Sequence, residues 1–127
     1  NQQFIYSLRR MLDPIKEHVD NNFNPLPEEY VKEFAPIRQK INDLMQMTAE
    51  QIETNRYENY REILAEADAC KDELSVVRKK HIDRIQHTKD NTLMQISLVY
   101  LNVLQESQEF LSVMRHQLRA AKKFMEK

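Results

Sequence analysis

The sequence of 127 residues contains no glycine and no tryptophan. Average usage of about 7% would give roughly nine glycines in a chain of this length. Glycine supplies the positive φ angles that tight turns and phosphate-binding loops require. Walker loops, dinucleotide-binding fingerprints, nucleophile elbows and standard EF-hand loops therefore cannot form from this sequence. The classes of protein that depend on those loops are excluded.

Cysteine, net charge and long apolar runs are also scarce. The single Cys70 can form neither an intrachain disulfide nor a multi-cysteine zinc site, which fits a reducing compartment. The 19 basic and 20 acidic side chains give a formal net charge of −1, which argues against a dedicated nucleic-acid-binding protein. The most apolar window, residues 93–104, is much shorter than the about 20 residues of a membrane-spanning helix. We therefore expect this window to lie inside a soluble helical bundle.

Apolar residues recur every three or four positions along almost the whole chain, and no stretch alternates with period two for long enough to form a strand. This spacing predicts an all-α fold, an antiparallel up-down bundle of three to four helices that forms one domain. We expect breaks between the helices near residues 20–27, 53–56 and 87–91. The residues expected in the common core are Ile63, Leu74, Val77, Ile96, Val103, Leu104, Phe110 and Met114.

Prolines and polar residues predict where the helices begin and bend. Pro14 should kink the first helix, over residues 3–21, or start it afresh. Pro27 should lie in the first turn of the second helix, in which Pro36 should cause a kink or a short separate turn. The first helix offers the apolar residues Phe4, Leu8, Met11, Ile15 and Val19.

Asn55 and Glu58 have the spacing of a capping box, which predicts a third helix over about residues 56–86. The last helix carries two adjacent apolar rows, so it should contact at least two neighbours. The first row contains Leu93, Ile96, Tyr100, Val103, Ser107, Phe110, Met114, Gln117, Ala121 and Phe124. The second row contains Leu101, Leu104, Leu111 and Leu118.

The residues that could carry out chemistry do not form a recognisable site. A bundle-type metal site needs Glu-x-x-His pairs, and none of His18, His81, His87 and His116 follows a glutamate by three residues. Only His81 lies on an apolar row, which favours a structural histidine. The position of Cys70 among apolar residues favours a small buried side chain over a nucleophile. We therefore expect no catalytic residue, no cofactor and no enzyme activity.

Two groups of basic residues could suggest a phosphate- or membrane-binding surface. The first contains Arg78, Lys79, Lys80, His81, Arg84 and Lys89, and the second contains Arg115, His116, Arg119, Lys122 and Lys123. Antiparallel helices would bring the first group near Glu28, Glu29 and Glu33, and the second near Glu50, Glu53, Glu58 and Glu62. We therefore expect these cations to be solvated or paired rather than to bind a ligand.

Four segments carry a family resemblance. They are Phe-Ala-Pro-Ile-Arg-Gln-Lys-Ile at 34–41, Ile-Leu-Ala-Glu-Ala-Asp at 63–68, Ser-Leu-Val-Tyr-Leu-Asn-Val-Leu-Gln-Glu-Ser-Gln-Glu at 97–109 and Met-Arg-His-Gln-Leu-Arg-Ala-Ala-Lys-Lys-Phe at 114–124. Together they make residues 34–124 resemble the PhoU-like helical domain, in the version found at the cytoplasmic C-terminus of bacterial sodium/phosphate cotransporter-related proteins. The resemblance implies a PhoU-like three-helix unit at 27–127, preceded at 1–26 by an extra helix and a Pro/Asn linker.

PhoU proteins also carry pairs of carboxylates, four residues apart, that can hold clustered metal ions. The matching positions here are Asp68 and Asp72 in one helix and Gln105 and Glu109 in the next. Because the amide of Gln105 brings no negative charge, a cluster of hard metal ions loses a ligand. We therefore expect no bound metal, with Asp68, Asp72 and Glu109 as charges on helix faces.

The resemblance implies a regulatory or scaffolding domain of a sodium-dependent phosphate transporter, on the cytoplasmic side of the bacterial inner membrane. Its partner would be the membrane-embedded part of the same parent chain, since a start at Asn1 without an initiator methionine is expected of a fragment. A homodimer is a second expected assembly; nucleic acid and a small-molecule substrate are not expected. Two alternatives remain open: a helical interaction or signalling module unrelated to phosphate, and a carboxylate metal-binding bundle.

Overall fold

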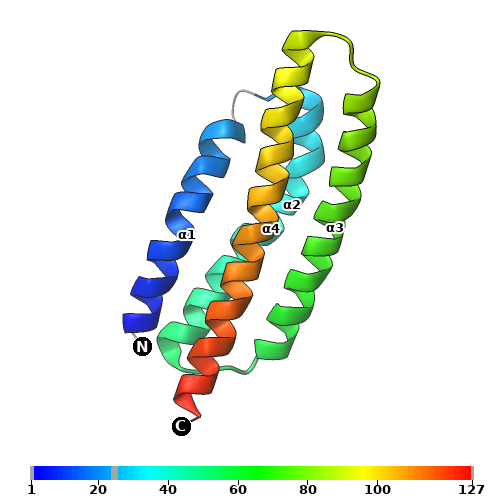
Figure 1. The fold of residues 1–127 in the computed structure, drawn as a ribbon. Helices are drawn as coiled ribbons and strands as arrows, with labels where there is room; N and C mark the ends of the chain where they lie inside the picture. The colour runs from blue at the N-terminus through cyan, green and yellow to red at the C-terminus, as the bar shows by residue number, and fades with distance from the viewer. Residues whose placement is uncertain (1, 24–25, 127) are drawn as a thin grey trace.

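The computed structural model describes residues 2–23 and 26–126, with the side chains at 2–5, 7, 8, 11, 20, 22 and 23 left undescribed. It consists of α1 (Gln2–Phe23), α2 (Glu28–Thr54), α3 (Tyr60–Gln86) and α4 (Asn91–Met125). The helices run alternately up and down (Figure 1). No strand occurs in the part of the chain just defined. The prediction of an all-α up-down bundle is confirmed.

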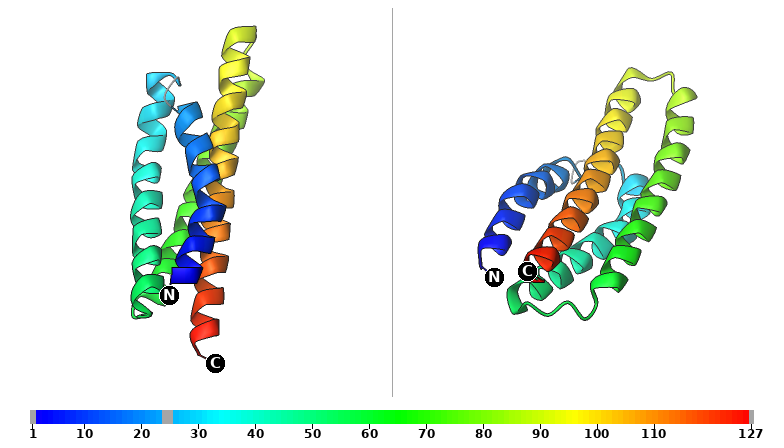
Figure 2. Two further views of the ribbon diagram at one scale, coloured as in Figure 1. Left: turned by 90° about the vertical axis from the view of Figure 1, so that its left-hand side faces the viewer. Right: turned by 60° about the horizontal axis from the view of Figure 1, so that its bottom comes forward.

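The four helices are not equivalent in their packing. α2 and α4 run parallel through the middle of the bundle, and α1 and α3 lie on opposite sides of this pair (Figures 1 and 2). His18 of α1 contacts Glu106 of α4 at 2.6 Å, and Arg115 of α4 contacts Asp68 of α3 at 3.1 Å. α4 thus joins α1 to α3 and has neighbours on both sides, as its two apolar rows predict.

A single hydrophobic core runs along the bundle. Of the residues expected there, all except Val77 and Ile96 are buried; these two are half-buried at its edge. Leu12 of α1 is fully buried, although the spacing assigned its neighbour Met11 to the apolar face. Phe4, Leu8 and Met11 lie outside the described side chains.

The junction between α2 and α3 differs from its prediction. Asn55 has φ of 55° and ends α2, so it does not cap α3 with Glu58. Its amide donates to the Ile52 carbonyl at 3.4 Å, and the Arg56 amide donates to the Gln51 carbonyl at 3.2 Å. This pair of bonds is a Schellman motif, in which asparagine occupies the left-handed position that glycine usually takes. The capping-box prediction was wrong, and α3 begins at Tyr60.

Both internal prolines lie within unbroken helices. α1 continues through Pro14 and α2 through Pro36, so neither starts a fresh helix or a separate turn. Both prolines are exposed, and the carbonyl that each leaves without an amide partner can therefore be hydrated. Pro27 lies just before α2, at its N-cap, and Asp90 caps α4 by accepting from the Thr92 amide at 2.8 Å.

Candidate functional site

The best-developed polar site lies where α2, α3 and α4 meet; we call it the Glu33 cluster. It consists of Tyr30, Glu33, His81, Arg84 and Tyr100. One oxygen of Glu33 accepts a hydrogen bond from Arg84 at 2.6 Å and another from the Tyr100 hydroxyl at 2.8 Å. Lys80 lies 3.4 Å from the other oxygen. Glu33 of α2 is thus bonded to both of the helices it faces.

The surroundings of Glu33 determine the protonation states of Glu33 and Tyr100. Burial raises the pKa of Glu33, but hydrogen bonds from Arg84 and Tyr100 and the charges of Arg84 and Lys80 outweigh it and lower the pKa. Burial and the adjacent Glu33 carboxylate raise the pKa of Tyr100. Glu33 therefore stays ionised and Tyr100 protonated at neutral pH, which preserves the hydrogen bond between them.

His81 is fully buried beside this carboxylate. Its Nε2 lies 2.7 Å from the Ser97 carbonyl oxygen, so Nε2–H donates, and Nδ1 has no hydrogen-bond partner. Burial lowers the pKa of His81, and the charge of Arg84 acts in the same direction. His81 has the buried, hydrogen-bonded setting expected of a structural histidine.

Aromatic contacts complete the Glu33 cluster. The ring of Tyr30 is stacked on that of Tyr100, with centroids 4.6 Å apart, and the His81 ring lies edge-on to both. The Arg84 guanidinium lies 5.0 Å from the Tyr30 centroid, and the Tyr30 hydroxyl lies 3.3 Å from that of Ser97. The cluster uses its polar groups to hold three helices together.

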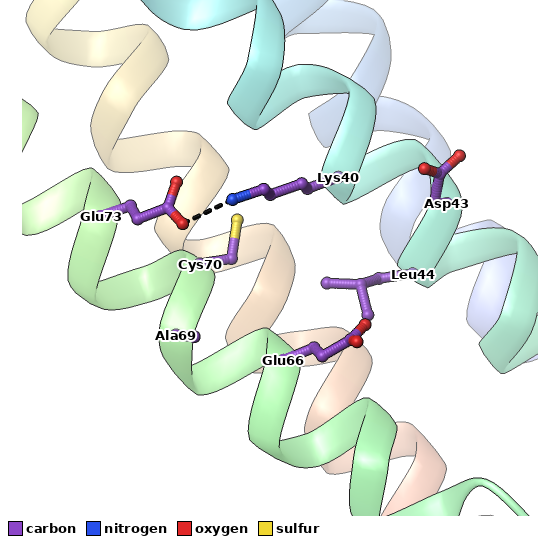
Figure 3. A pocket seen from close by; sticks show the side chains of 7 residues that line it. All are labelled: Lys40, Asp43, Leu44, Glu66, Ala69, Cys70 and Glu73. Atoms are coloured by element: carbon purple, nitrogen blue, oxygen red, sulfur yellow. Dashed lines mark hydrogen bonds and ion pairs between the residues drawn. The ribbon is translucent and has the colours of Figure 1, made fainter.

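A second site is a pocket of about 260 Å³ between α2 and α3 (Figure 3). Its lining residues are Lys40, Asp43, Leu44, Glu66, Ala69, Cys70 and Glu73. Lys40 forms an ion pair of 2.6 Å with Glu73 across the pocket. Burial, followed by the Glu73 carboxylate, raises the pKa of the Cys70 thiol to about 11. The thiol is therefore protonated at neutral pH and is a poor nucleophile.

The family-equivalent carboxylate positions are not assembled into one site. Asp68 accepts a hydrogen bond from Arg115 at 3.1 Å. Asp72, Gln105 and Glu109 are exposed. Among the residues that the structure describes, no three His, Cys, Asp or Glu side chains are grouped so that they could hold a metal ion. Asp68 therefore serves as a link between α3 and α4.

The acidic partners predicted for the two basic groups are found in the first group but not for Arg115 of the second. In the first group, Arg84 pairs with Glu29 at 3.3 Å and with Glu33, as expected from antiparallel α2 and α3. In the second, Arg115 pairs with Asp68 rather than with any of the four glutamates expected near this group. The prediction for Arg115 was wrong because this residue lies level with the interior of α3 rather than with its first turn.

Sequence reasoning missed the Glu33 cluster as a unit. It placed Tyr100 and His81 on apolar rows and Glu33 near the first basic group, but it did not include Tyr30. Tyr30 and Glu33 are three residues apart and so share a face of α2. The sequence signal that could have predicted this cluster is an aromatic residue and a carboxylate side by side at the edge of an apolar helix face.

Comparison of the chain with protein-family models, with curated proteins and with solved structures found no match. None of the helices, over their described residues, combines the length and the apolar character that a membrane crossing requires. The fold and its sites define the class of the molecule: an all-α, up-down four-helix bundle whose best-formed polar cluster links neighbouring helices.

Proposed function

We propose that this chain is a regulatory or scaffolding domain of a sodium-dependent phosphate transporter. In this proposal it acts on the cytoplasmic side of the bacterial inner membrane through contacts of its helix faces with the membrane-embedded part of the parent protein. The link with phosphate transport depends on the resemblance of residues 34–124 to the PhoU-like domain. The proposed mode of action, through contacts of helix faces, is supported by features of the structure.

The ion pair between Asp68 and Arg115 is the observation that carries the mode of action. Asp68 occupies a position at which the resemblance would place a metal ligand, and its carboxylate instead binds a cation of the neighbouring helix. The Glu33 cluster uses its charges in the same way. Groups that could have carried out metal or acid–base chemistry stabilise the bundle, and the helix faces remain for binding a protein partner.

Phosphate uptake by the whole parent transporter tests the proposal. Cells that carry the parent protein should take up radiolabelled phosphate in a sodium-dependent manner, and deleting residues 1–127 should change how uptake responds to external phosphate. A parent gene without membrane spans, or a response that the deletion leaves unchanged, would contradict the proposal. The first outcome would favour the helical module unrelated to phosphate.

Two adjacent substitutions in α4 separate an effect of the folded bundle from an effect of chain length. Val103 is buried, and its neighbour Asn102 is exposed. Val103→Asp introduces a carboxylate into the core, whereas Asn102→Asp introduces the same group at the surface. In the parent protein, Val103→Asp should reproduce the effect of the deletion and Asn102→Asp should not.

A further inference from the structure

The pocket of about 260 Å³ between α2 and α3 takes no part in the Glu33 cluster, and we call it the α2–α3 pocket. Two of its lining carboxylates, Glu66 and Glu73, belong to α3. They are seven residues apart, so they lie on one face of this helix, about 10.5 Å apart along its axis. One wall of the pocket therefore carries two negative charges at two separate levels.

The part of the pocket between these two carboxylates is apolar. Ala69 and Cys70 lie on α3 at the levels between them. The side chain of Leu44 reaches in from α2 (Figure 3), and Leu44 is 2% exposed. A ligand that lies along α3 would thus contact a carboxylate, an apolar surface and a second carboxylate in turn.

The thiol of Cys70 is a buried group that points toward the cation of the pocket. Cys70 is 1% exposed and forms no disulfide, and its Sγ points toward the Lys40 ammonium (Figure 3). Among the residues that the structure describes, none forms a hydrogen bond with this thiol. Because a thiol sulfur is a weak acceptor, the floor of the pocket suits an ammonium group at this place.

Lys40 shows which kind of cation the α2–α3 pocket accepts. Its side chain reaches across from α2 and places a primary ammonium 2.6 Å from a Glu73 oxygen. Glu66 acts on this ammonium only through its charge. The side chains of Lys40 and Glu73 are 54% and 43% exposed, and exposed ion pairs contribute little net free energy. A second ammonium ion can therefore displace Lys40 at small cost.

The lining of the pocket has an excess of negative charge. It includes three carboxylates, those of Asp43, Glu66 and Glu73, and one ammonium, that of Lys40. Asp43 accepts a hydrogen bond from Gln39 at 2.9 Å and points away from Lys40 (Figure 3), so it adds to the negative field without facing the ion pair. Such a field favours a ligand with more than one positive charge.

We propose that the α2–α3 pocket binds a linear aliphatic polyamine. One ammonium of the ligand replaces that of Lys40 at Glu73, and a second ammonium binds Glu66. The methylene chain between them packs on Cys70 and Leu44. A metal ion fits less well, because no three His, Cys, Asp or Glu side chains in the described part of the chain are grouped so that they could hold one. The inference does not depend on the proposed function.

Titration of the isotopically labelled chain with spermidine, a linear triamine, tests the site by nuclear magnetic resonance. The amides of residues 66–73 should shift in a saturable manner, with one triamine bound per chain. Glu66→Gln and Glu73→Gln should each weaken binding about fivefold, because each removes one exposed charge contact. Lys40→Met should strengthen binding, since its ammonium no longer competes for Glu73.

Two neutral substitutions on α3 control for a general effect of charge. Glu62→Gln and Asp72→Asn remove exposed carboxylates that do not line the pocket, and both should leave the affinity unchanged. Propylamine, which has one ammonium group, should bind more weakly than spermidine. Circular dichroism verifies that all variants are helical. Absence of binding, an equal loss in the control variants, weaker binding by Lys40→Met, or the same shifts with magnesium would overturn the proposal.

Discussion

The hydroxyl of Tyr100 donates a 2.8 Å hydrogen bond to the carboxylate of Glu33, which joins the two parallel helices in the middle of the bundle. The same carboxylate oxygen accepts from Arg84 of α3. One partly buried acceptor thus links three helices. Since a hydrogen bond to a charged group contributes about 1.5–3 kcal/mol, this link contributes to stability as much as a sizeable apolar side chain does.

Tyr100→Phe should therefore lower the free energy of unfolding by about 1–3 kcal/mol, because Glu33 loses a donor while its desolvation remains. Urea denaturation measures the change. Tyr57→Phe is the matched control, since the Tyr57 hydroxyl is buried without a partner; its removal should cost nothing or increase stability. Equal losses for both variants would show that the bond to Glu33 contributes little.

The stability of the bundle should decrease when the pH falls from about 7 to 5. The pKa of His81 is lowered on folding by burial, so the unfolded chain binds a proton first, at its usual value of about 6.5. The stabilisation is complete above that pH and is lost as the pH falls towards the lower pKa of the folded state. Stability measured between pH 7.5 and 5 should decrease less in His81→Gln, whose amide can still donate to Ser97.

The matched control for this pH dependence is His116→Gln, because His116 of α4 is exposed. Its pH dependence of stability should equal that of the native chain. The charged groups that act on His81 are Arg84, Glu33 and Glu29. If His81→Gln and the native chain lost stability in parallel, another group would be the one that titrates.

Val103→Asp should abolish cooperative thermal unfolding. Val103 is 1% exposed in the core, and an unpaired buried charge costs several kcal/mol, a large share of a typical domain's stability. Asn102→Asp places the same carboxylate at an exposed position of the same helix, and we expect its melting curve to match the native one. A Val103→Asp protein that melts like the native chain would disprove the core assignment.

Millimolar magnesium, manganese or zinc should leave the melting temperature unchanged. A ligand that binds only the folded state would raise it by mass action, and Asp68 is already bonded to Arg115. Differential scanning fluorimetry with each ion provides the measurement, and Asp68→Asn with Asp72→Asn is the control. A metal-dependent rise that this double variant removes would restore the metal-cluster hypothesis.

Asn55→Gly should stabilise the bundle. Asn55 has the only positive φ among the described residues, and a non-glycine residue pays roughly 1 kcal/mol for the left-handed conformation. Part of this gain is offset because glycine loses more backbone entropy on folding, so we expect a net increase of a few tenths of a kcal/mol. Asn55→Ala, which keeps the Cβ atom and loses the polar side chain, should decrease stability.

The sequence was sufficient to predict the fold because the periodicity of apolar residues depends only on helix geometry. Ile63, Leu74 and Phe110 were assigned correctly because each lies in the middle of a long amphipathic stretch. The ends were harder: Asn55 suits an N-cap and a left-handed C-terminal position equally well by residue type. Only the three-dimensional path of the chain after Thr54 distinguishes the two.

The candidate site was predicted less well than the fold. Arg84 with Glu29 and Glu33 follows from antiparallel neighbours, whose levels along the bundle can be estimated from helix length. The contact of Glu33 with Tyr100 joins α2 to α4, which are separated by a whole helix in sequence. Nothing in the spacing of either segment fixes which residues of two such helices lie level, so this contact and the pairing of Asp68 with Arg115 needed the structure.

The position of α1 on one side of the central helices α2 and α4 affects the order in which the molecule unfolds. α1 contacts α2 and α4, while no contact joins it to α3 over the residues described. The Glu33 cluster lies on the opposite side, within α2, α3 and α4. Different parts of a fold open with different free energies, and α1 can separate from α2 and α4 without breaking any bond of the Glu33 cluster. Amide hydrogens of α1 should therefore exchange with solvent sooner than those around His81. The chain would then unfold α1 before it opens the Glu33 cluster.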